Sequence, residues 1–248
     1  MDILGKITLL AVPLRAEPRD SSEMVSQLIY GETYRVNEES SNKKWLKITV
    51  DHDGYEGWLD TKQHSPSATS TPELSKRILE GGVAFHKKAG RNIFLPEGSV
   101  VSTEDFDWKY FNGSFSAGFQ HFLTSEIGSF LETFLGSPYL WGGRTRFGVD
   151  CSGFTQVVLS MCGISLLRDA SQQYTQGEDI EFGQQKFGDL AFFKNSEEKI
   201  THVGICDENG EIIHASGMVR KDKLTSEGIL ITDEKRLSHV LAGIRRVL

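Results

Sequence analysis

The first part of the chain alternates short apolar runs with turn residues. Within it, Leu46, Ile48 and Val50 occupy alternate positions, as expected for a strand with one buried face. Asp53 and Gly54 follow as a tight hairpin signal. The runs that have the length and composition of strands cover residues 7–12, 25–29, 33–37, 45–50 and 57–59. They predict a small all-β barrel over residues 1–62.

The next segment, residues 63–75, is rich in Ser, Thr and Pro. Such a composition favours extended chain over packing, so we interpret the segment as a linker. Short apolar runs broken by Gly and Pro then resume at Val83–Phe85, Ile93–Leu95 and Trp108–Phe111. These runs predict a second, more degenerate barrel over residues 76–117.

Helical spacing appears only in the last part of the chain, residues 118–248. Two amphipathic helices are predicted by apolar residues three and four positions apart, namely Phe122, Ile127, Phe130, Leu131, Phe134 and Leu135, and then Phe154, Val157, Val158, Met161 and Ile164. Strands are predicted afterwards at Leu190–Phe193, Val203–Cys206, Ile212–Ala215 and Ile229–Ile231. Helices grouped before strands indicate an α+β domain with an antiparallel sheet.

Composition narrows the classes of protein that fit. The chain has 248 residues, 38% of them apolar and 25% charged, which is enough to build a core and excludes global disorder. The 27 basic residues are outnumbered by 34 acidic ones and form no stripe, so nucleic acid is not an expected partner. The apolar run Ile7–Leu14 lacks the flanks of a signal peptide, and no stretch approaches the roughly 20 apolar residues of a spanning helix. We therefore expect a cytoplasmic protein without a membrane span.

The three cysteines are Cys151, Cys162 and Cys206, and no two of them are closely spaced. This spacing favours reduced thiols over a disulfide framework, and no metal site is expected. A zinc site built from His202, His214 and cysteines is the weaker alternative. Cys162 and Cys206 lie within predicted apolar elements and are interpreted as buried structural residues.

Cys151 has a different setting, because it follows a glycine-rich turn and begins the second predicted helix. Unpaired amides and the helix dipole at that point favour a thiolate, so a lowered pKa is expected. Neighbouring glycines allow backbone amides to approach a substrate carbonyl, as an oxyanion hole requires.

A nucleophilic thiol needs a base, and His202 and His214 lie on either side of a predicted hairpin turn. If residues 208–210 form a three-residue loop, His214 lies opposite Gly204 and both histidines point to the same side of the sheet. A two-residue turn would place them on opposite sides. Gly210 at the end of the loop favours the first register. The other histidines, interpreted as surface residues, are His52, His64, His86, His121 and His239.

The last 130 or so residues resemble the NlpC family of papain-like cell-wall cysteine peptidases. The motifs that carry this resemblance are Pro138–Gly153, Arg168–Ala170, Gly188–Leu190 with Phe192 and Phe193, and His202–Ile205. The resemblance implies Cys151 as nucleophile, His202 as general base and then acid, and His214 as the residue that orients the imidazole. Tyr139 would help to polarise the scissile carbonyl, and no cofactor is required. Trp141 is interpreted as a core aromatic.

The first 60 or so residues resemble bacterial SH3-like domains, on the segments Pro13–Pro18, Tyr30–Glu32 and Gly54–Trp58. The resemblance therefore implies one or two SH3-like β-barrels ahead of a papain-like α+β peptidase domain. Family members of this organisation commonly cleave the γ-D-glutamyl to L-diamino acid bond of murein peptides. A subgroup requires the free amino group of the leading L-Ala, which implies murein recycling in the cytoplasm.

The residues that the resemblance places at the substrate's amino end are Asp150, Ser152, Glu32 and Tyr55. A buried ammonium group needs carboxylates beside it, which is the role expected of Asp150 and Glu32. Arg168 and Asp169 either contact substrate or brace the loop beneath the cleft. Two rival functions remain open: an amidase or acyltransferase on the same fold, and a non-catalytic protein that binds wall fragments.

Overall fold

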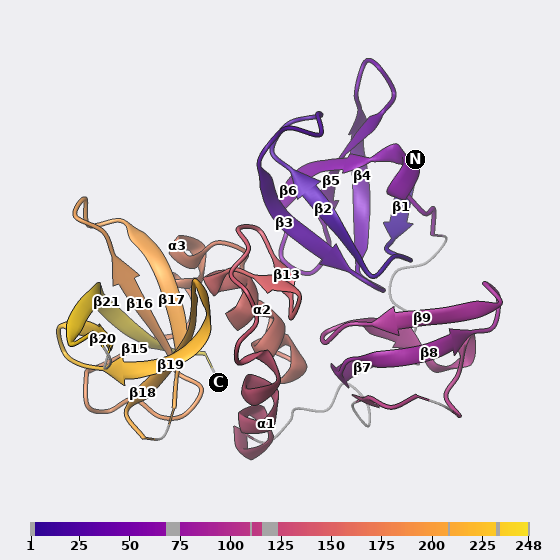
Figure 1. The fold of residues 1–248 in the computed structure, drawn as a ribbon. Coiled ribbons are helices and arrows are strands. Elements are labelled where there is room, and N and C mark those ends of the chain that lie inside the picture. The colour runs from indigo at the N-terminus through magenta and orange to yellow at the C-terminus, as the bar shows by residue number, and fades with distance from the viewer. Residues whose placement is uncertain are drawn as a thin grey trace. The chain divides into compact units, whose positions relative to one another are not determined.

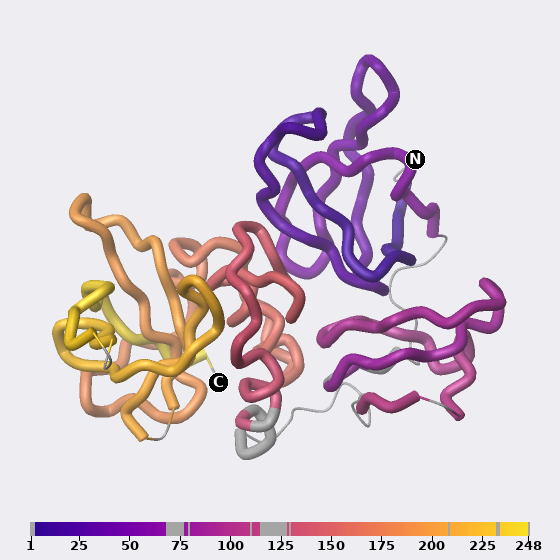
Figure 2. Tube along the Cα trace, in the orientation of Figure 1, coloured from indigo at the N-terminus to yellow at the C-terminus, as the bar shows by residue number. Residues whose placement is uncertain are grey.

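The computed structural model describes residues 3–67, 75–109, 111–115, 124–207, 209–231 and 234–247. The chain divides into two compact units. The N-terminal unit comprises Met1–His121 and Trp141–Arg146, and the C-terminal unit comprises Phe122–Leu140 and Phe147–Leu248. Figures 1 and 2 trace the chain from indigo at the N-terminus to yellow at the C-terminus.

The first part of the N-terminal unit is a six-stranded antiparallel barrel. Its strands are β1 (Ile3–Lys6), β2 (Ala11–Arg15), β3 (Met24–Ile29), β4 (Thr33–Glu39), β5 (Trp45–Val50) and β6 (Glu56–Asp60), in the spatial order β1-β4-β5-β6-β2-β3, and a 3-10 turn, η1 (Thr61–Gln63), follows. The predicted barrel is therefore present. The single strand expected over residues 7–12 is wrong, because the chain turns between β1 and β2.

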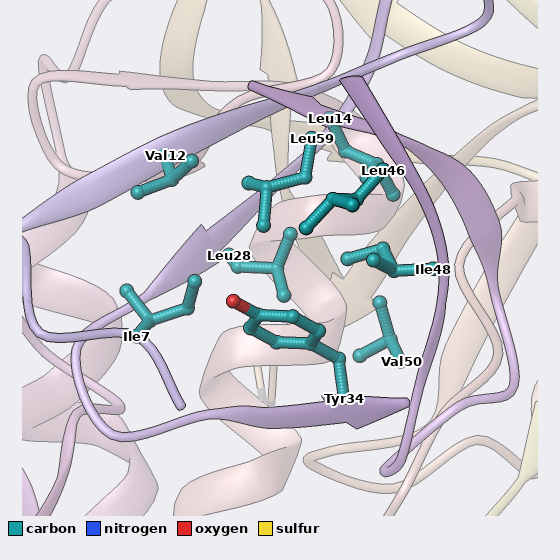
Figure 3. Close-up of a cluster of buried hydrophobic side chains, with 9 residues drawn as sticks. All are labelled: Ile7, Val12, Leu14, Leu28, Tyr34, Leu46, Ile48, Val50 and Leu59. Carbon is teal, nitrogen blue, oxygen red and sulfur yellow. The ribbon is translucent and has the colours of Figure 1, made fainter. Parts of the chain in front are cut away.

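Alternation along the strands produces the core of this barrel. As expected, Leu46, Ile48 and Val50 of β5 are buried. Their partners come from every other strand except β1, and Figure 3 shows the side chains gathered inside the barrel: Ile7, Val12, Leu14, Leu28, Tyr34, Leu46, Ile48, Val50 and Leu59.

The predicted linker is described only at its ends, since residues 68–74 lie outside the described part of the chain. At its start, the backbone N–H of Ser67 donates to Leu4 O and the Tyr34 hydroxyl bonds to His64 Nδ1, at 2.9 and 2.8 Å. Residues up to 67 thus pack on the first barrel. At the other end, Ser75 already begins a strand.

The second part of the N-terminal unit holds two small antiparallel sheets. Strand order is β10-β7-β12 in one and β11-β8-β9 in the other. The elements are β7 (Ser75–Glu80), β8 (Gly82–His86), β9 (Arg91–Leu95), β10 (Val100–Ser102), η2 (Thr103–Asp105), β11 (Phe106–Asp107) and β12 (Ser114–Phe115). Tyr30 from the first barrel joins their core, with its ring 5.8 Å from that of Phe106. Gly31 lets the chains approach, because a Cβ there would lie 1.7 Å from Val100 O.

The segment Trp141–Arg146, which includes β13 (Arg144–Thr145), also belongs to the N-terminal unit. The backbone N–H of Arg144 donates to Gln27 Oε1 at 2.9 Å. Trp141 is 60% exposed and donates from Nε1 to Glu23 Oε1 at 2.7 Å, so its interpretation as a core aromatic is wrong.

The C-terminal unit contains the helices and the largest sheet. The helices are α1 (Thr124–Phe134), α2 (Cys151–Met161) and α3 (Ala170–Gln173), and the strands are β14 (Gly148–Val149), β15 (Glu178–Ile180), β16 (Leu190–Lys194), β17 (Ile200–Cys206), β18 (Glu211–Ser216), β19 (Met218–Leu224), β20 (Gly228–Ile231) and β21 (Arg236–Arg246). Seven of these strands pair in the order β15-β21-β16-β17-β18-β19-β20, and β20 also pairs with β21, which closes the sheet on itself.

Both predicted helices are present, and their apolar faces are buried as expected. Phe130, Leu131 and Phe134 of α1 and Phe154 and Val157 of α2 are in the core. Leu135 is exposed, since α1 has already ended, and Phe122 lies outside the described residues.

The predicted α+β domain is thus confirmed in part. Two helices precede the antiparallel sheet as expected, but the described chain contains much more strand than helix. Strands β15, β19 and β21 were not predicted, since charged and polar residues interrupt the apolar pattern along each of them. Helix α2 packs against β17 and β18 (Figure 1), which brings the predicted nucleophile next to the predicted histidine strands. No helix among the described residues has the length and hydropathy needed to cross a membrane.

Candidate functional site

Cys151 is the first residue of α2, where the sequence placed it. The preceding residue, Asp150, has extended backbone and caps the helix, because its Oδ1 accepts from the N–H of Gly153 at 2.6 Å. A carboxylate is a preferred N-cap, and it also complements the positive end of the helix dipole. The sequence Asp-Cys-Ser-Gly therefore defines both the start of the helix and the position of the thiol.

The guanidinium of Arg168 binds the two residues on either side of Cys151. Its Nη2 donates to Asp150 Oδ2 at 2.6 Å, and its Nη1 donates to Asp150 Oδ1 at 3.1 Å and to Ser152 Oγ at 2.9 Å. Arg168 is 1% exposed, so the ion pair is fully inside the protein. Of the two roles that the sequence left open for Arg168, the geometry favours bracing. Asp169 is half-buried just before α3, and its backbone N–H donates to Gln172 Oε1 at 3.0 Å.

The Cys151 sulfur faces β17. Backbone N–H groups of Val203 and Ser152 hydrogen-bond to it, so it lies next to the strand that carries His202. The pKa of the thiol is raised to about 12, by burial first and then by the charge on Asp150, while the two N–H groups and Arg168 lower it by less. The expectation of a lowered pKa is therefore wrong, because loss of solvent outweighs the favourable helix terminus.

The two histidines on β17 and β18 have the predicted register. His214 pairs with Gly204, so both imidazoles lie on the same side of the sheet. His202 Nε2 and His214 Nδ1 are 2.8 Å apart, and both rings are buried. Gly204 makes room for this arrangement, since a Cβ there would lie 2.8 Å from that of His214.

The hydrogen-bonded series continues to β19, which the sequence analysis missed. His214 Nε2 lies 3.0 Å from Asp222 Oδ2, and Asp222 in turn pairs with Arg220, whose Nε is 2.6 Å from Oδ2. A tight turn at Gly217, between β18 and β19, could have revealed this. It pairs His214 with Arg220 and Ile212 with Asp222, which puts all three polar side chains on one face.

His239 of β21 is a further residue of the site, and its assignment to the surface is wrong. Its ring stacks on that of His202, with centroids 4.2 Å apart and planes inclined by 23°. Ser238 Oγ bonds to its Nδ1 at 2.8 Å. The sequence carried no signal for this contact, since it depends on closure of the sheet, which brings β21 back beside the histidine strands.

Burial lowers the pKa of all three imidazoles. The pKa of His202 is well below its usual value, through burial first and then through His214 and His239. Burial also lowers the pKa of His214, against the opposing effect of Asp222, and it lowers that of His239 to about 4. The three rings are therefore neutral at neutral pH.

Tyr139 is half-buried in the C-terminal unit near the thiol. Burial raises its pKa to about 12, with smaller contributions from Cys151 and Asp150, which places the phenol within electrostatic reach of both. The Tyr139 N–H donates to Gly217 O at 2.9 Å, which anchors its backbone to the turn between β18 and β19.

Glu32 and Tyr55 both lie in the N-terminal unit. Glu32 is buried, and its Oε2 accepts from Arg144 Nη1 at 2.8 Å and from the N–H of Ile29 at 2.9 Å. Arg144 lowers the pKa of the Glu32 carboxyl, despite its burial. Tyr55 packs its half-buried ring against the barrel core. Glu32 is therefore a carboxylate that already has a guanidinium partner.

The remaining cysteines, Cys162 and Cys206, are buried, the first at the end of α2 and the second in β17. Among residues that the structure describes, no group of three or more His, Cys, Asp or Glu side chains is placed to hold a metal ion. The residues of the site can do thiol and imidazole chemistry: a sulfur at a helix start lies against the strand of a base that a second imidazole and a carboxylate hold in place.

Comparison with known proteins finds a family match mostly within the C-terminal unit and another in the first barrel. Residues 136–233 match the NlpC/P60 family, and residues 14–63 match the bacterial dipeptidyl-peptidase Sh3 domain. Gamma-D-glutamyl-L-lysine dipeptidyl-peptidase of Bacillus subtilis (strain 168) is 28% identical over 216 residues, which cover 77% of this chain and 71% of that protein. Probable endopeptidase NlpC of Escherichia coli (strain K12) is 41% identical over 102 residues, or 40% of this chain and 61% of that protein.

Solved structures show the same fold. The crystal structure of an NlpC/P60 family protein from Bacillus cereus ATCC 10987 superposes with a TM-score of 0.83 at 19% identity, and the match covers 99% of both chains. Together, these matches and the geometry of the two units show that the chain combines a domain of the NlpC/P60 peptidase family with a bacterial SH3 domain.

Proposed function

We propose that this protein is a cysteine peptidase that hydrolyses the γ-D-glutamyl to L-diamino acid bond of murein-derived peptides. One observation carries the proposal: the Cys151 sulfur, at the start of α2, accepts the N–H of Val203 on the strand whose His202 is hydrogen-bonded to His214. A nucleophile, a base and an orienting group thus follow one another through adjacent elements, as in a papain-like peptidase.

The mechanism starts from a neutral thiol and a neutral imidazole. His202 takes the thiol proton as the sulfur bonds to the scissile carbonyl carbon. The tetrahedral intermediate then collapses, the C–N bond breaks, and the imidazolium returns the proton to the leaving amine. Water, activated by the same imidazole, attacks the thioester, and the carboxylic acid leaves as Cys151 regains its proton. His214 keeps the His202 ring in the orientation that both halves require.

The oxyanion needs hydrogen-bond donors that are in place before the reaction. Tyr139 is the proposed side-chain donor, because its phenol is protonated at neutral pH and lies within electrostatic reach of Cys151. The N–H groups of Ser152 and Val203 already point at the sulfur, and they stabilise negative charge that develops there.

The substrate class rests on the relatives and on the charges around the site. Two relatives that match more than three-quarters of this chain are named gamma-D-glutamyl-L-lysine dipeptidyl-peptidase. We propose that the substrate has a free N-terminal L-Ala whose ammonium group interacts with Asp150, Ser152, Glu32 and Tyr55. Asp150 and Glu32 each have an arginine partner, so neither is a bare carboxylate.

The charges around Glu32 in the N-terminal unit do not by themselves select an ammonium group, so its proposed selection rests on the resemblance to the relatives. Glu32 and Asp53 are both ionised at neutral pH, because neighbouring groups that include His52 and Arg144 lower their pKa values, that of Asp53 to about 2. Arg144 pairs with Glu32, and the charge of Arg77 also acts on Glu32, so two guanidinium groups balance the two carboxylates. Peptides with a free L-Ala arise once the sugar has been removed, so the proposed role is murein recycling in the cytoplasm.

The test is a panel of stem peptides cleaved by the wild-type protein and by Cys151→Ala, with products identified by mass spectrometry. L-Ala-γ-D-Glu-L-Lys, its diaminopimelate counterpart and N-acetylated forms of both separate the bond cleaved from the amino-terminal requirement. Cys162→Ala is the matched control, since Cys162 is a buried cysteine at the other end of the same helix.

Release of L-Ala-γ-D-Glu by the wild type and by Cys162→Ala, with none from Cys151→Ala, is the expected result. Equal cleavage of free and N-acetylated peptides would contradict the N-terminal selection while leaving the peptidase assignment standing. If Cys151→Ala retained full activity, Cys151 would not be the nucleophile.

A further inference from the structure

The hydrogen-bonded series from His202 does not end at His214. Asp222 is 3% exposed, and its Oδ2 lies 3.0 Å from His214 Nε2. Arg220 approaches the same carboxylate with both ends of its guanidinium, as Nη2 donates to Oδ1 at 2.8 Å and Nε is 2.6 Å from Oδ2. Both oxygens of Asp222 are thus held in one orientation by a side chain on its own strand.

This geometry determines which nitrogen of each ring carries a proton. An ionised carboxylate only accepts, so His214 must donate from Nε2. Because the His214 ring is neutral, its Nδ1 is then an acceptor, and it can bond to His202 Nε2 only if that nitrogen is protonated. The neutral His202 ring is left with its lone pair on Nδ1, the nitrogen that His214 does not occupy.

We infer that Asp222 is a fourth member of the site, a positioning residue that holds His202 in the one tautomer able to accept the thiol proton. The inference rests on the proposed function for its catalytic meaning, and on the contacts of the neutral, buried rings for the proton positions. Without an acceptor at Asp222, His214 can carry its proton on Nδ1 instead of Nε2. Its Nδ1–H then donates to His202 Nε2, so the His202 proton must be on Nδ1. That ring could not act as the base.

Arg220 has a complementary part in this arrangement. A carboxylate beside His214 favours an imidazolium, whereas the Arg220 charge opposes it. Arg220 therefore holds the Asp222 carboxylate in place while His214 stays neutral. His239 also faces these rings: it stacks on His202 and has no hydrogen bond to Asp222 among the contacts described.

The test compares Asp222→Asn and Asp222→Ala with wild type. Asparagine cannot satisfy the site in either orientation of its amide. With the N–H₂ group in place of Oδ1, it faces the Nη2 donor of Arg220; in place of Oδ2, it faces Arg220 Nε and His214 Nε2. We expect kcat to fall roughly 10²-fold or more with little change in KM, on the scale of the tautomer effect in Ser-His-Asp peptidases. Asp222→Glu should recover part of the loss.

Asp189→Asn is the matched control for folding. Asp189 is equally buried in the same unit and has two hydrogen bonds from Arg246, but it contacts none of the histidines in the hydrogen bonds described. This variant should lose stability and keep kcat. A comparable fall in kcat for Asp189→Asn and Asp222→Asn would overturn the inference, since it would show a general effect of buried carboxylates.

Nitrogen-15 NMR of the imidazoles gives a readout that does not depend on activity. In the wild type we expect protonated Nε2 and unprotonated Nδ1 on both His202 and His214, and a mixture of tautomers in Asp222→Ala. Wild-type spectra with Nδ1–H on His214 would overturn the inference. Spectra as expected from a protein that cleaves no peptide would overturn the proposed function instead and support the assigned proton positions.

Discussion

Before the reaction Cys151 is a neutral thiol and His202 a neutral imidazole, because burial raises the pKa of the first and lowers the pKa of the second. Burial raises the pKa of the thiol to about 12 and lowers that of the imidazole well below its usual value. The proton therefore has to move during the attack on the carbonyl, and a preformed thiolate–imidazolium pair is not the resting state.

This state predicts a simple pH dependence for alkylation of Cys151 by iodoacetamide. Only the thiolate reacts, so the rate should rise steadily from about pH 7 to about pH 10, whereas an ordinary cysteine reaches half its maximal rate near pH 8.5 and levels off above that pH. Mass spectrometry of the Cys151 peptide, beside a short unstructured cysteine peptide, provides the measurement. A plateau below pH 8 would reveal an ion pair and contradict the neutral resting state.

The stacked ring of His239 predicts a second effect at the same scale. Stacked aromatic pairs are worth roughly 0.5–1.5 kcal/mol, so freeing the His202 ring in His239→Ala should lower kcat by about 2- to 10-fold. His239→Phe retains a ring over His202 and should recover most of this loss. If Phe and Ala behaved alike in steady-state kinetics, the stacking would not contribute to the orientation of His202.

At the scale of elements, the start of α2 depends on the buried pair between Asp150 and Arg168. Four hydrogen bonds meet at the two oxygens of Asp150: two from Arg168, one from the Gly153 N–H, and one from the Ser152 hydroxyl. The helix terminus, the thiol and the loop that carries Arg168 are therefore one connected assembly.

Arg168→Met should destabilise the C-terminal unit by about 3–5 kcal/mol, since it leaves the Asp150 carboxylate buried without a partner. Asp179→Asn, which breaks an Arg–Asp pair with an exposed carboxylate in the same unit, should cost less than about 1 kcal/mol. Chemical denaturation, followed through the hydrogen exchange of α2 amides, measures both. The double variant Asp150→Asn, Arg168→Met should be more stable than Arg168→Met alone, and the opposite order would contradict this account.

At the scale of the whole molecule, the two units differ in how acid affects them. The C-terminal unit buries three imidazoles with lowered pKa values, His202, His214 and His239, and in the N-terminal unit burial lowers the pKa of His64. A lowered folded-state pKa means that the unfolded chain binds more protons below pH 6.5. Stability is therefore lost as the pH falls from 6.5 toward the folded-state values, which reach about 4 for His239.

Between about pH 7 and about pH 5, the C-terminal unit should lose more protection against hydrogen exchange than the N-terminal unit. Protonation of Glu32 and Asp53 should not contribute between these pH values. Their pKa values are lowered, so the stability that depends on their charge is lost only at more acidic pH. In His239→Phe the loss should be smaller, as one of the three titrating rings is gone. Equal losses in both units would rule out the buried histidines as the cause.

The sequence predicted correctly those features that depend on a few neighbouring residues. The hairpin at Gly210, the helix start at Cys151 and the buried face of β5 are features of this kind, and all three are present. Trp141 and His239 were assigned wrongly, since their surroundings come from residues distant in sequence. The polar strands β19 and β21 were missed, because their partly exposed faces carry no continuous apolar pattern.

The sequence by itself determined that a cysteine begins a helix and that two histidines share one side of a hairpin, because helix caps, turns and register follow from short-range chemistry. Tertiary structure alone decided the ionisation of these groups and the identity of their supports. Burial is a property of the whole fold, so it reversed the pKa shift expected for Cys151. Closure of the sheet brought His239 to His202, and the pairing of β18 with β19 supplied Asp222 to His214.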